Sequence, residues 1–143
     1  MKNFILFAVL LFTSAFSYSQ TGVYINDILI EKEKIKEFET TYQITIPDGR
    51  YWYDKECGVW GLEGGPTKGV LQPNWDIGTL KSDASNGDTG IFLNGREVHR
   101  EELTFFQPLV YLLGGNRIWI NNKGDIGLEG QPKKFNMKDF AKN

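Results

Sequence analysis

Cysteine and histidine are nearly absent from this 143-residue sequence, which contains one of each. A single cysteine, Cys57, cannot form an internal disulfide, so the chain must rely on its apolar core for stability. We expect this thiol to be reduced and partly buried. A single histidine, His99, leaves a zinc site or a Ser-His-Asp triad only one possible centre, without a Gly-x-Ser-x-Gly motif. We expect His99 to be an exposed residue at the start of a helix.

Basic clusters and long apolar runs are also missing. The sequence has 16 Lys and Arg against 18 Asp and Glu, which gives a net charge of −2. Nucleic acid and anionic membrane surfaces attract clustered basic residues, so the composition argues against both as partners. The apolar run Phe4–Phe12 is well short of the roughly 20 residues that cross a bilayer.

Residues 1–19 have the pattern of a secretory signal peptide. Lys2 precedes the short apolar run, and the small-x-small triplet Ser17–Ser19 suits signal peptidase. We expect cleavage after Ser19, which leaves residues 20–143 as one soluble mature domain. Because no cysteine near the cleavage site could take a lipid, we expect a secreted or periplasmic protein without stable membrane insertion.

The sequence repeats itself. Thr21–Asn26 matches Thr89–Asn94 without a gap. Further along, colinear matches join Arg50–Trp52 to Arg117–Trp119, and Gly61–Gly64 to Gly127–Gly130. The series predicts two diverged copies of one unit, residues 21–72 and 89–136, joined by a surface loop over residues 73–88.

Each copy has the same predicted order of elements. Turn signals at residues 26–27 and 94–95 indicate a first hairpin, and a second hairpin follows the helix. Ile35, Phe38 and Tyr42 form one apolar stripe of a surface helix. In the second copy, Pro108 predicts that the corresponding helix stops or kinks.

The predicted fold is therefore α+β, with internally duplicated β-β-α-β-β units. We expect the antiparallel hairpins of both copies to share one sheet or open barrel, with two short helices packed on its apolar face.

Four strings carry a resemblance to known proteins. They are Gly49–Asp54, Trp60–Pro66, Asp83–Ser85 and Gly90–Glu97. In these motifs the chain resembles a family of secreted bacterial proteins with no assigned activity, over Gly22 to about Pro132. It departs from the pattern at Gln131, where the first copy has a second glycine. The resemblance implies a coherent domain and transfers no chemistry.

Glu63 and Glu129 occupy equivalent places in the two copies. A glycan-acting hydrolase could use such a pair if the carboxyl groups lay about 5 to 10 Å apart. Hairpin register places Arg50 diagonal to Glu63, with Arg117 as the equivalent partner of Glu129, so we favour two ion pairs.

Two other constellations are weaker. Asp83, Ser85 and Asp88 could offer oxygen ligands to calcium, but their spacing misses the EF-hand pattern and suits turns in a solvated loop. Cys57 and His99 could form a nucleophile and base, yet the sequence context of a cysteine protease is missing. The sequence therefore predicts no metal, no cofactor and no catalytic residue.

The aromatic residues divide by repetition. Trp52 and Trp119 are kept in both copies, which suits a pseudo-symmetric core. Four others, Tyr51, Tyr53, Trp60 and Trp75, have no aromatic counterpart in the second copy. Beside them are Gly61, Gly64 and Gly65, which would let a ligand approach closely. We predict these seven residues as ligand-binding, although packing in a small core explains them equally well.

These observations predict a noncatalytic binding module for a glycan or protein of the cell envelope. The paired-glutamate hydrolase is the first alternative. A structural or inhibitor-like role is the second.

Overall fold

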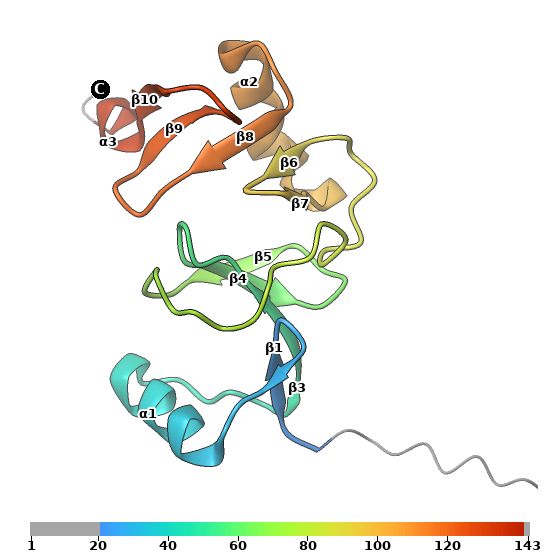
Figure 1. Cartoon of the computed structure of the whole chain (residues 1–143), viewed down its shortest axis with the longest axis vertical. Helices are drawn as coiled ribbons and strands as arrows, with labels where there is room; N and C mark the ends of the chain where they lie inside the picture. Colours follow the sequence, from blue (N-terminus) through green and yellow to red (C-terminus); the bar gives the residue numbers. More distant parts are fainter. Residues whose placement is uncertain (1–20, 142–143) are drawn as a thin grey trace, which may run out of the picture.

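The chain folds into two five-stranded β-sheets, each with its own helix (Figure 1). The computed structural model describes residues 21–141, so the predicted signal peptide lies outside the described residues. The first copy contains β1 (Val23–Ile25), β2 (Ile28–Leu29), α1 (Lys32–Tyr42), β3 (Gly49–Tyr53), β4 (Val59–Leu62) and β5 (Thr67–Val70). The second contains β6 (Phe92–Leu93), β7 (Arg96–Glu97), the 3₁₀ helix η1 (Arg100–Glu102), α2 (Leu103–Leu113), β8 (Arg117–Ile120), β9 (Asp125–Leu128), β10 (Lys133–Asn136) and α3 (Met137–Phe140).

The predicted α+β class and the duplicated unit are confirmed. The strand order is β2-β1-β3-β4-β5 in one sheet and β7-β6-β8-β9-β10 in the other, so the two copies share one topology. Each copy adds a fifth strand, and its first strand pairs in parallel with the strand that follows the helix. Each parallel pair joins two strands of the same copy. The hairpins therefore form two sheets rather than the one shared sheet or open barrel that the sequence predicts.

An asparagine at the same place in each copy fixes the parallel pair. Asn26 and Asn94 have φ angles of 48° and 49°, which their short polar side chains tolerate. The Asn26 side chain accepts a hydrogen bond from the Tyr53 backbone N–H and donates one to the Tyr53 carbonyl. Asn94 does the same with Ile120. The predicted turn therefore also continues the hydrogen bonding between the two parallel strands by one residue.

Pro108 does not stop helix α2, which runs through it from Leu103 to Leu113. Both Pro108 and Thr104, whose carbonyl the proline leaves without an N–H partner, are exposed, so water can satisfy that carbonyl. The opposite face buries Phe106, Leu109 and Leu113. Burial of this face stabilises the helix enough to offset the lost hydrogen bond.

The two copies have unequal cores. In the second copy nine buried side chains form one cluster, to which Ile118, Ile120 and Ile126 belong. The corresponding cluster of the first copy contains only three buried side chains, Val23 and Tyr53 among them, with half-buried residues around it. The first copy is therefore the less completely packed half.

Candidate functional site

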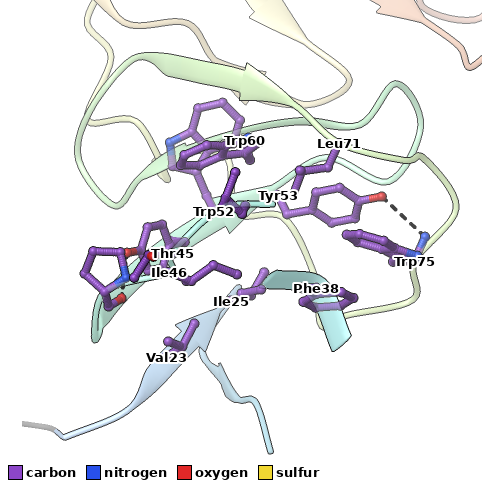
Figure 2. A pocket seen from close by; sticks show the side chains of 13 residues that line it. Val23, Ile25, Phe38, Thr45, Ile46, Trp52, Tyr53, Trp60, Leu71 and Trp75 are labelled. Carbon is purple, nitrogen blue, oxygen red and sulfur yellow. Dashed lines mark hydrogen bonds between the residues drawn. The ribbon is translucent and has the colours of Figure 1, made fainter. Parts of the chain in front are cut away.

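One cavity is lined by the four aromatic residues that have no counterpart in the second copy, Tyr51, Tyr53, Trp60 and Trp75. The cavity lies between helix α1 and the first sheet and has a volume of about 80 Å³ (Figure 2). That is about half of the roughly 150 Å³ apolar cavity that holds benzene, so three or four carbon atoms fit. The exposed residues Ile44 and Thr45 stand at its rim, where a ligand could enter.

Strand alternation gives β3 two faces. Tyr51 and Tyr53 pack with the cluster of Val23 on the side of the cavity. Tyr53 is 2% exposed. The ring of Trp52 meets the second copy instead, where the Arg96 guanidinium lies 4.0 Å from its centroid.

Trp75 holds helix α1 over the cavity. Its ring stacks on Phe38 with the centroids 4.3 Å apart, and the Tyr42 ring meets it edge-on at 5.8 Å. Phe38 is the buried residue of α1, whose N-terminus has no side-chain cap. Two aromatic contacts with Trp75 of the connecting loop therefore help to fasten the helix to the first copy.

The hydroxyl groups of Tyr51 and Tyr53 are already bonded within the first copy. Tyr51 donates to the Pro47 carbonyl at 2.7 Å, and Tyr53 donates to the Gln72 carbonyl at 2.5 Å. Burial raises the pKa of both phenols, so both stay neutral donors. A sugar needs free hydrogen-bond donors and acceptors. The two tyrosine hydroxyls already donate their protons to backbone carbonyls. The cavity surface suits a hydrocarbon group.

The three predicted glycines lie elsewhere and do not line this cavity. A Cβ on Gly61 would lie 2.3 Å from the Pro66 carbonyl oxygen and 2.7 Å from the Trp52 ring. Gly65 accepts a hydrogen bond from the Trp52 indole N–H, and Gly64 has a φ of 81° in a turn. Gly61 and Gly65 thus serve the packing of Trp52.

The second copy has aliphatic side chains at the equivalent strand positions. Ile118, Ile120 and Ile126 stand where the first copy has Tyr51, Tyr53 and Trp60. All three isoleucines are at most 7% exposed. The aromatic lining that β3 and β4 give the cavity is therefore specific to the first copy.

The predicted Arg–Glu ion pairs are confirmed in both copies. Arg50 Nε lies 2.5 Å from a Glu63 carboxylate oxygen, and Arg117 Nε lies 2.5 Å from that of Glu129. Arg50 also pairs with Asp27. The two glutamates lie on different sheets, and the small polar cavity that Glu63 lines does not include Glu129. The arrangement does not resemble the two-carboxylate site of a glycosidase.

His99 is half-buried and serves as a helix cap. Its Nδ1 accepts a hydrogen bond from the Glu101 backbone N–H at 3.2 Å, and its own backbone N–H donates to Glu102. The sequence predicts the helix start correctly and the full exposure wrongly, because the side chain folds back over η1.

Two of the three loop residues considered as calcium ligands contact arginines, and the prediction that they lie in a solvated loop is wrong for Ser85. Ser85, fully buried, accepts from Arg96 Nη1 at 2.6 Å, and Asp88 pairs with Arg100 at 2.6 Å. Within residues 21–141 no group of three or more His, Cys, Asp or Glu side chains is placed to hold a metal ion.

Cys57 is a free, half-buried thiol that donates to Asp54 at 3.4 Å. Burial, followed by the charge of Asp54, raises the pKa of the Cys57 thiol to about 12, from an ordinary value of 9.0. We expect native Cys57 to react with iodoacetamide at pH 8 about a thousandfold more slowly than the same thiol in urea, since the thiolate is the reactive form. Mass spectrometry of timed samples measures both rates. A native rate within tenfold of the unfolded rate would contradict the assignment.

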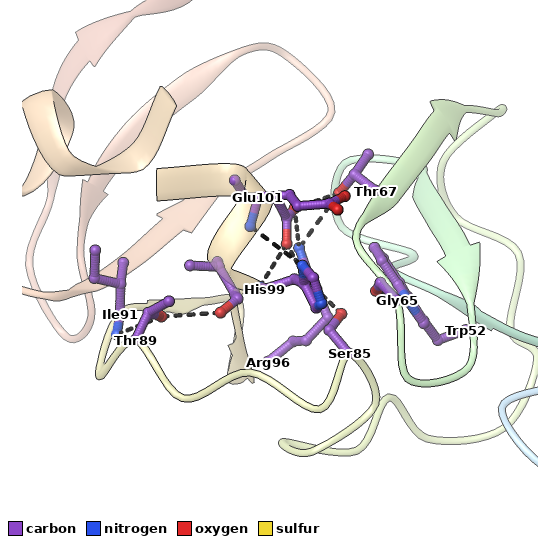
Figure 3. Close-up of polar contacts among 11 residues, drawn as sticks. Trp52, Gly65, Thr67, Ser85, Thr89, Ile91, Arg96, His99 and Glu101 are labelled. Atoms are coloured by element: carbon purple, nitrogen blue, oxygen red, sulfur yellow. Dashed lines mark hydrogen bonds and ion pairs between the residues drawn. The ribbon is translucent and has the colours of Figure 1, made fainter. Parts of the chain in front are cut away.

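Sequence reasoning missed a buried polar cluster between the copies (Figure 3). Arg96 is 0% exposed and makes a two-pronged ion pair with Glu102, at 2.8 and 3.1 Å. Thr67 of the first copy donates to the same carboxylate at 2.6 Å, and the guanidinium lies over Trp52. A signal was available, because Arg96 and Glu102 replace Ile28 and Lys34 of the first copy together.

A second link joins the copies through Asp54, which is 2% exposed. Its carboxylate accepts from the Asn94 side chain at 2.8 Å, across the junction. Together with the Arg96 cluster this bond fixes how the two sheets meet, and it leaves the cavity of the first copy on the far side of β3.

Comparison with known proteins gives two partial matches. The chain is 34% identical over 113 residues to extra-large guanine nucleotide-binding protein 1 of Arabidopsis thaliana, which covers 76% of the chain and 13% of that protein. It is 35% identical over 113 residues to extra-large guanine nucleotide-binding protein 2 of the same plant, over 73% of the chain and 13% of that protein. The chain thus spans about 13% of the length of these curated relatives.

No protein-family model matches the chain, and no solved structure matches it significantly. Among the described residues, none of the helices combines the length and the apolar character that crossing a bilayer requires.

Proposed function

We propose that this chain is a noncatalytic binding module whose first copy holds an apolar side chain of a partner protein. The observation that carries the proposal is the cavity between α1 and the first sheet, lined by aromatic side chains where the second copy has buried isoleucines. An unfilled cavity lowers the stability of the fold, by about 24 cal/mol per Å³ in lysozyme cores. Binding of a ligand would explain why the chain keeps such a cavity.

The chemistry of the cavity favours a protein partner over a glycan. The hydroxyl groups of Tyr51 and Tyr53 donate hydrogen bonds to backbone carbonyls of the first copy. A sugar bound there would find few polar partners for its own hydroxyl groups among the mostly apolar side chains of the lining, which is costly in an apolar site. A branched aliphatic side chain needs no hydrogen bond and matches the volume of about 80 Å³.

Catalysis is not part of the proposal. Glu63 and Glu129 are each held by an arginine, and Cys57 is held largely as the neutral thiol. These groups favour a framework role over that of an acid, base or nucleophile.

The partial relatives are compatible with this proposal. Their names say that those proteins bind guanine nucleotides. This chain has no Gly-x-x-x-x-Gly-Lys-Ser/Thr loop for phosphates. We therefore propose that the shared segment is a protein-contact unit that occurs inside longer chains. Because the sequence predicts export, we propose a partner in the envelope or the extracellular space.

A pair of matched threonine variants tests the proposal. Thr45 and Thr41 are both exposed, and only Thr45 lines the cavity. We expect linear peptides selected from a displayed random library to share one Val, Leu or Ile anchor. Thr45→Phe should weaken their binding at least tenfold by covering the rim, whereas Thr41→Phe should change it less than twofold.

Isothermal titration calorimetry of the selected peptides measures both effects. Equal binding by the two variants would show that the peptides dock elsewhere. Selection of glycans on an array, with binding that Thr45→Phe abolishes, would replace the protein partner with a carbohydrate.

A further inference from the structure

A cleft of about 610 Å³ lies between the two copies. Its lining comes from β4, β5 and the turn before β4 in the first copy, and mainly from η1, α2, β8 and α3 in the second. Pockets that hold small molecules usually have volumes of about 300 to 1,000 Å³. The cleft can therefore hold a whole small molecule, whereas the cavity of the first copy, at about 80 Å³, has room for only a few carbon atoms. The two share no lining residue, so this inference does not depend on what the cavity binds.

The surface of the cleft is largely apolar, and part of it faces solvent. Phe105 is 51% exposed, and Val70, from the other copy, is 67% exposed. The Phe105 ring meets the buried Phe106 ring edge-on, with the centroids 5.0 Å apart. At the equivalent position of α1 the first copy has Glu37, so an aromatic ring here is specific to the second copy. A hydrocarbon group that covered Phe105 and Val70 would be stabilised by the removal of their apolar surface from water.

Four of the polar side chains in the cleft are already bonded within the protein. Glu102 accepts four hydrogen bonds, which occupy both of its carboxylate oxygens. The Thr67 hydroxyl donates to that carboxylate, and the Cys57 thiol donates to Asp54. The side-chain oxygen of Asn121 accepts from two backbone N–H groups of its own turn. These groups hold the walls of the cleft together and offer little to a ligand.

Glu101 and Asn122 are the polar residues of the cleft that keep free hydrogen-bond acceptors. Both side chains are exposed, and neither has a hydrogen-bond or ion-pair partner among residues 21–141. The described residues that line the cleft include no Lys, Arg or His. An anionic ligand would therefore meet the Glu101 charge without a compensating cation, whereas an ammonium group would be attracted to it.

We infer that this cleft binds a small organic amine in its protonated form. The ammonium group lies beside the Glu101 carboxylate, with the Asn122 side-chain oxygen as a second acceptor. The aromatic or branched hydrocarbon body of the amine covers Phe105 and Val70. A peptide fits less well, because each of its backbone N–H and C=O groups needs a partner and only two polar side chains of the cleft are unoccupied.

Amide NMR titration with three matched probes tests the inference. Phenylbutylamine, phenylbutanol and phenylbutyrate share one apolar body and differ in the charge of the head group. We expect the amine to bind about fivefold more tightly than the alcohol, which is the upper end for a partly exposed ion pair, and the carboxylate to bind more weakly than either. Glu101→Gln should remove the advantage of the amine, and the matched change Glu33→Gln, at the equivalent exposed position of the first copy, should leave it unchanged.

Three results would overturn the inference. The first is the absence of saturable binding of the amine up to about 10 mM, which is weaker than a fragment of this size binds in a fitting pocket. The second is equal binding of the amine by Glu101→Gln and Glu33→Gln, which would place its head group elsewhere. The third is tighter binding of the peptide acetyl-Leu-Lys-Leu-amide than of the amine, lost in Glu101→Gln, which would assign the cleft to a basic segment of a protein.

Discussion

Replacing Arg96 by methionine is expected to lower the free energy of unfolding by about 3 to 5 kcal/mol, because it leaves a buried carboxylate without its counter-charge. Glu102 accepts four hydrogen bonds, and two of them come from Arg96. Methionine keeps much of the arginine stem's packing and removes the charge. Urea denaturation followed by tryptophan fluorescence measures the change.

Two controls separate the buried charge from the loss of packing. The double variant Arg96→Met with Glu102→Leu should recover most of the lost stability, because an apolar pair of similar volume replaces a buried ion pair at little net cost. Arg117→Met breaks the exposed pair with Glu129 and should cost less than about 1 kcal/mol. A double variant as unstable as Arg96→Met alone would mean that Arg96 acts through its contact with Trp52.

Acid should weaken the same cluster. Burial alone would raise the pKa of Glu102, but hydrogen bonds from Arg96 and Thr67 and the guanidinium charge outweigh it and lower the pKa. The ion pair therefore contributes fully above the pKa of an unfolded glutamate, about 4.3, and its contribution is lost as the pH falls through the folded-state value. The wild type should lose stability more steeply below about pH 4 than the double variant does.

The repeat made much of the fold predictable. Turn residues such as Asn26 and Asn94 locate the hairpins, and the conserved spacing of the two copies fixes the order of their elements. The parallel pairing of β1 with β3 was not predictable from hairpin signals, because those signals describe only neighbours in the chain. Pro108 was misread because its effect depends on which side of α2 faces water.

The candidate site was predictable in part. Repetition separated Tyr51 and Tyr53 from the framework, and both line the cavity. Their hydroxyl bonds to backbone carbonyls depend on loop positions that no sequence pattern gives. Arg96 was not predicted for a different reason. It is specific to the second copy, whereas the predicted site consisted of residues without a counterpart in that copy.

The two repeated tryptophans should differ in their effect on stability, with Trp52→Ala expected to cost about 3 to 5 kcal/mol and Trp119→Ala about 1 to 3 kcal/mol. Both indole N–H groups donate to a backbone carbonyl, from Trp52 to Gly65 and from Trp119 to Gln131. Trp52 is 1% exposed, whereas Trp119 is half-buried. Within each copy the two residues are therefore equivalent, and the difference arises at the junction.

The guanidinium of Arg96 accounts for much of that difference. It covers the Trp52 ring from the second copy, and a desolvated contact of this kind contributes up to about 2 kcal/mol. In the Arg96→Met, Glu102→Leu background the two alanine variants should therefore approach each other in cost. Chemical denaturation of each alanine variant, made both in the wild-type chain and in that background, tests this as a double-mutant cycle. If the gap between Trp52→Ala and Trp119→Ala stayed unchanged in that background, burial in the first copy alone would explain it, and the junction would contribute nothing to the stability of Trp52.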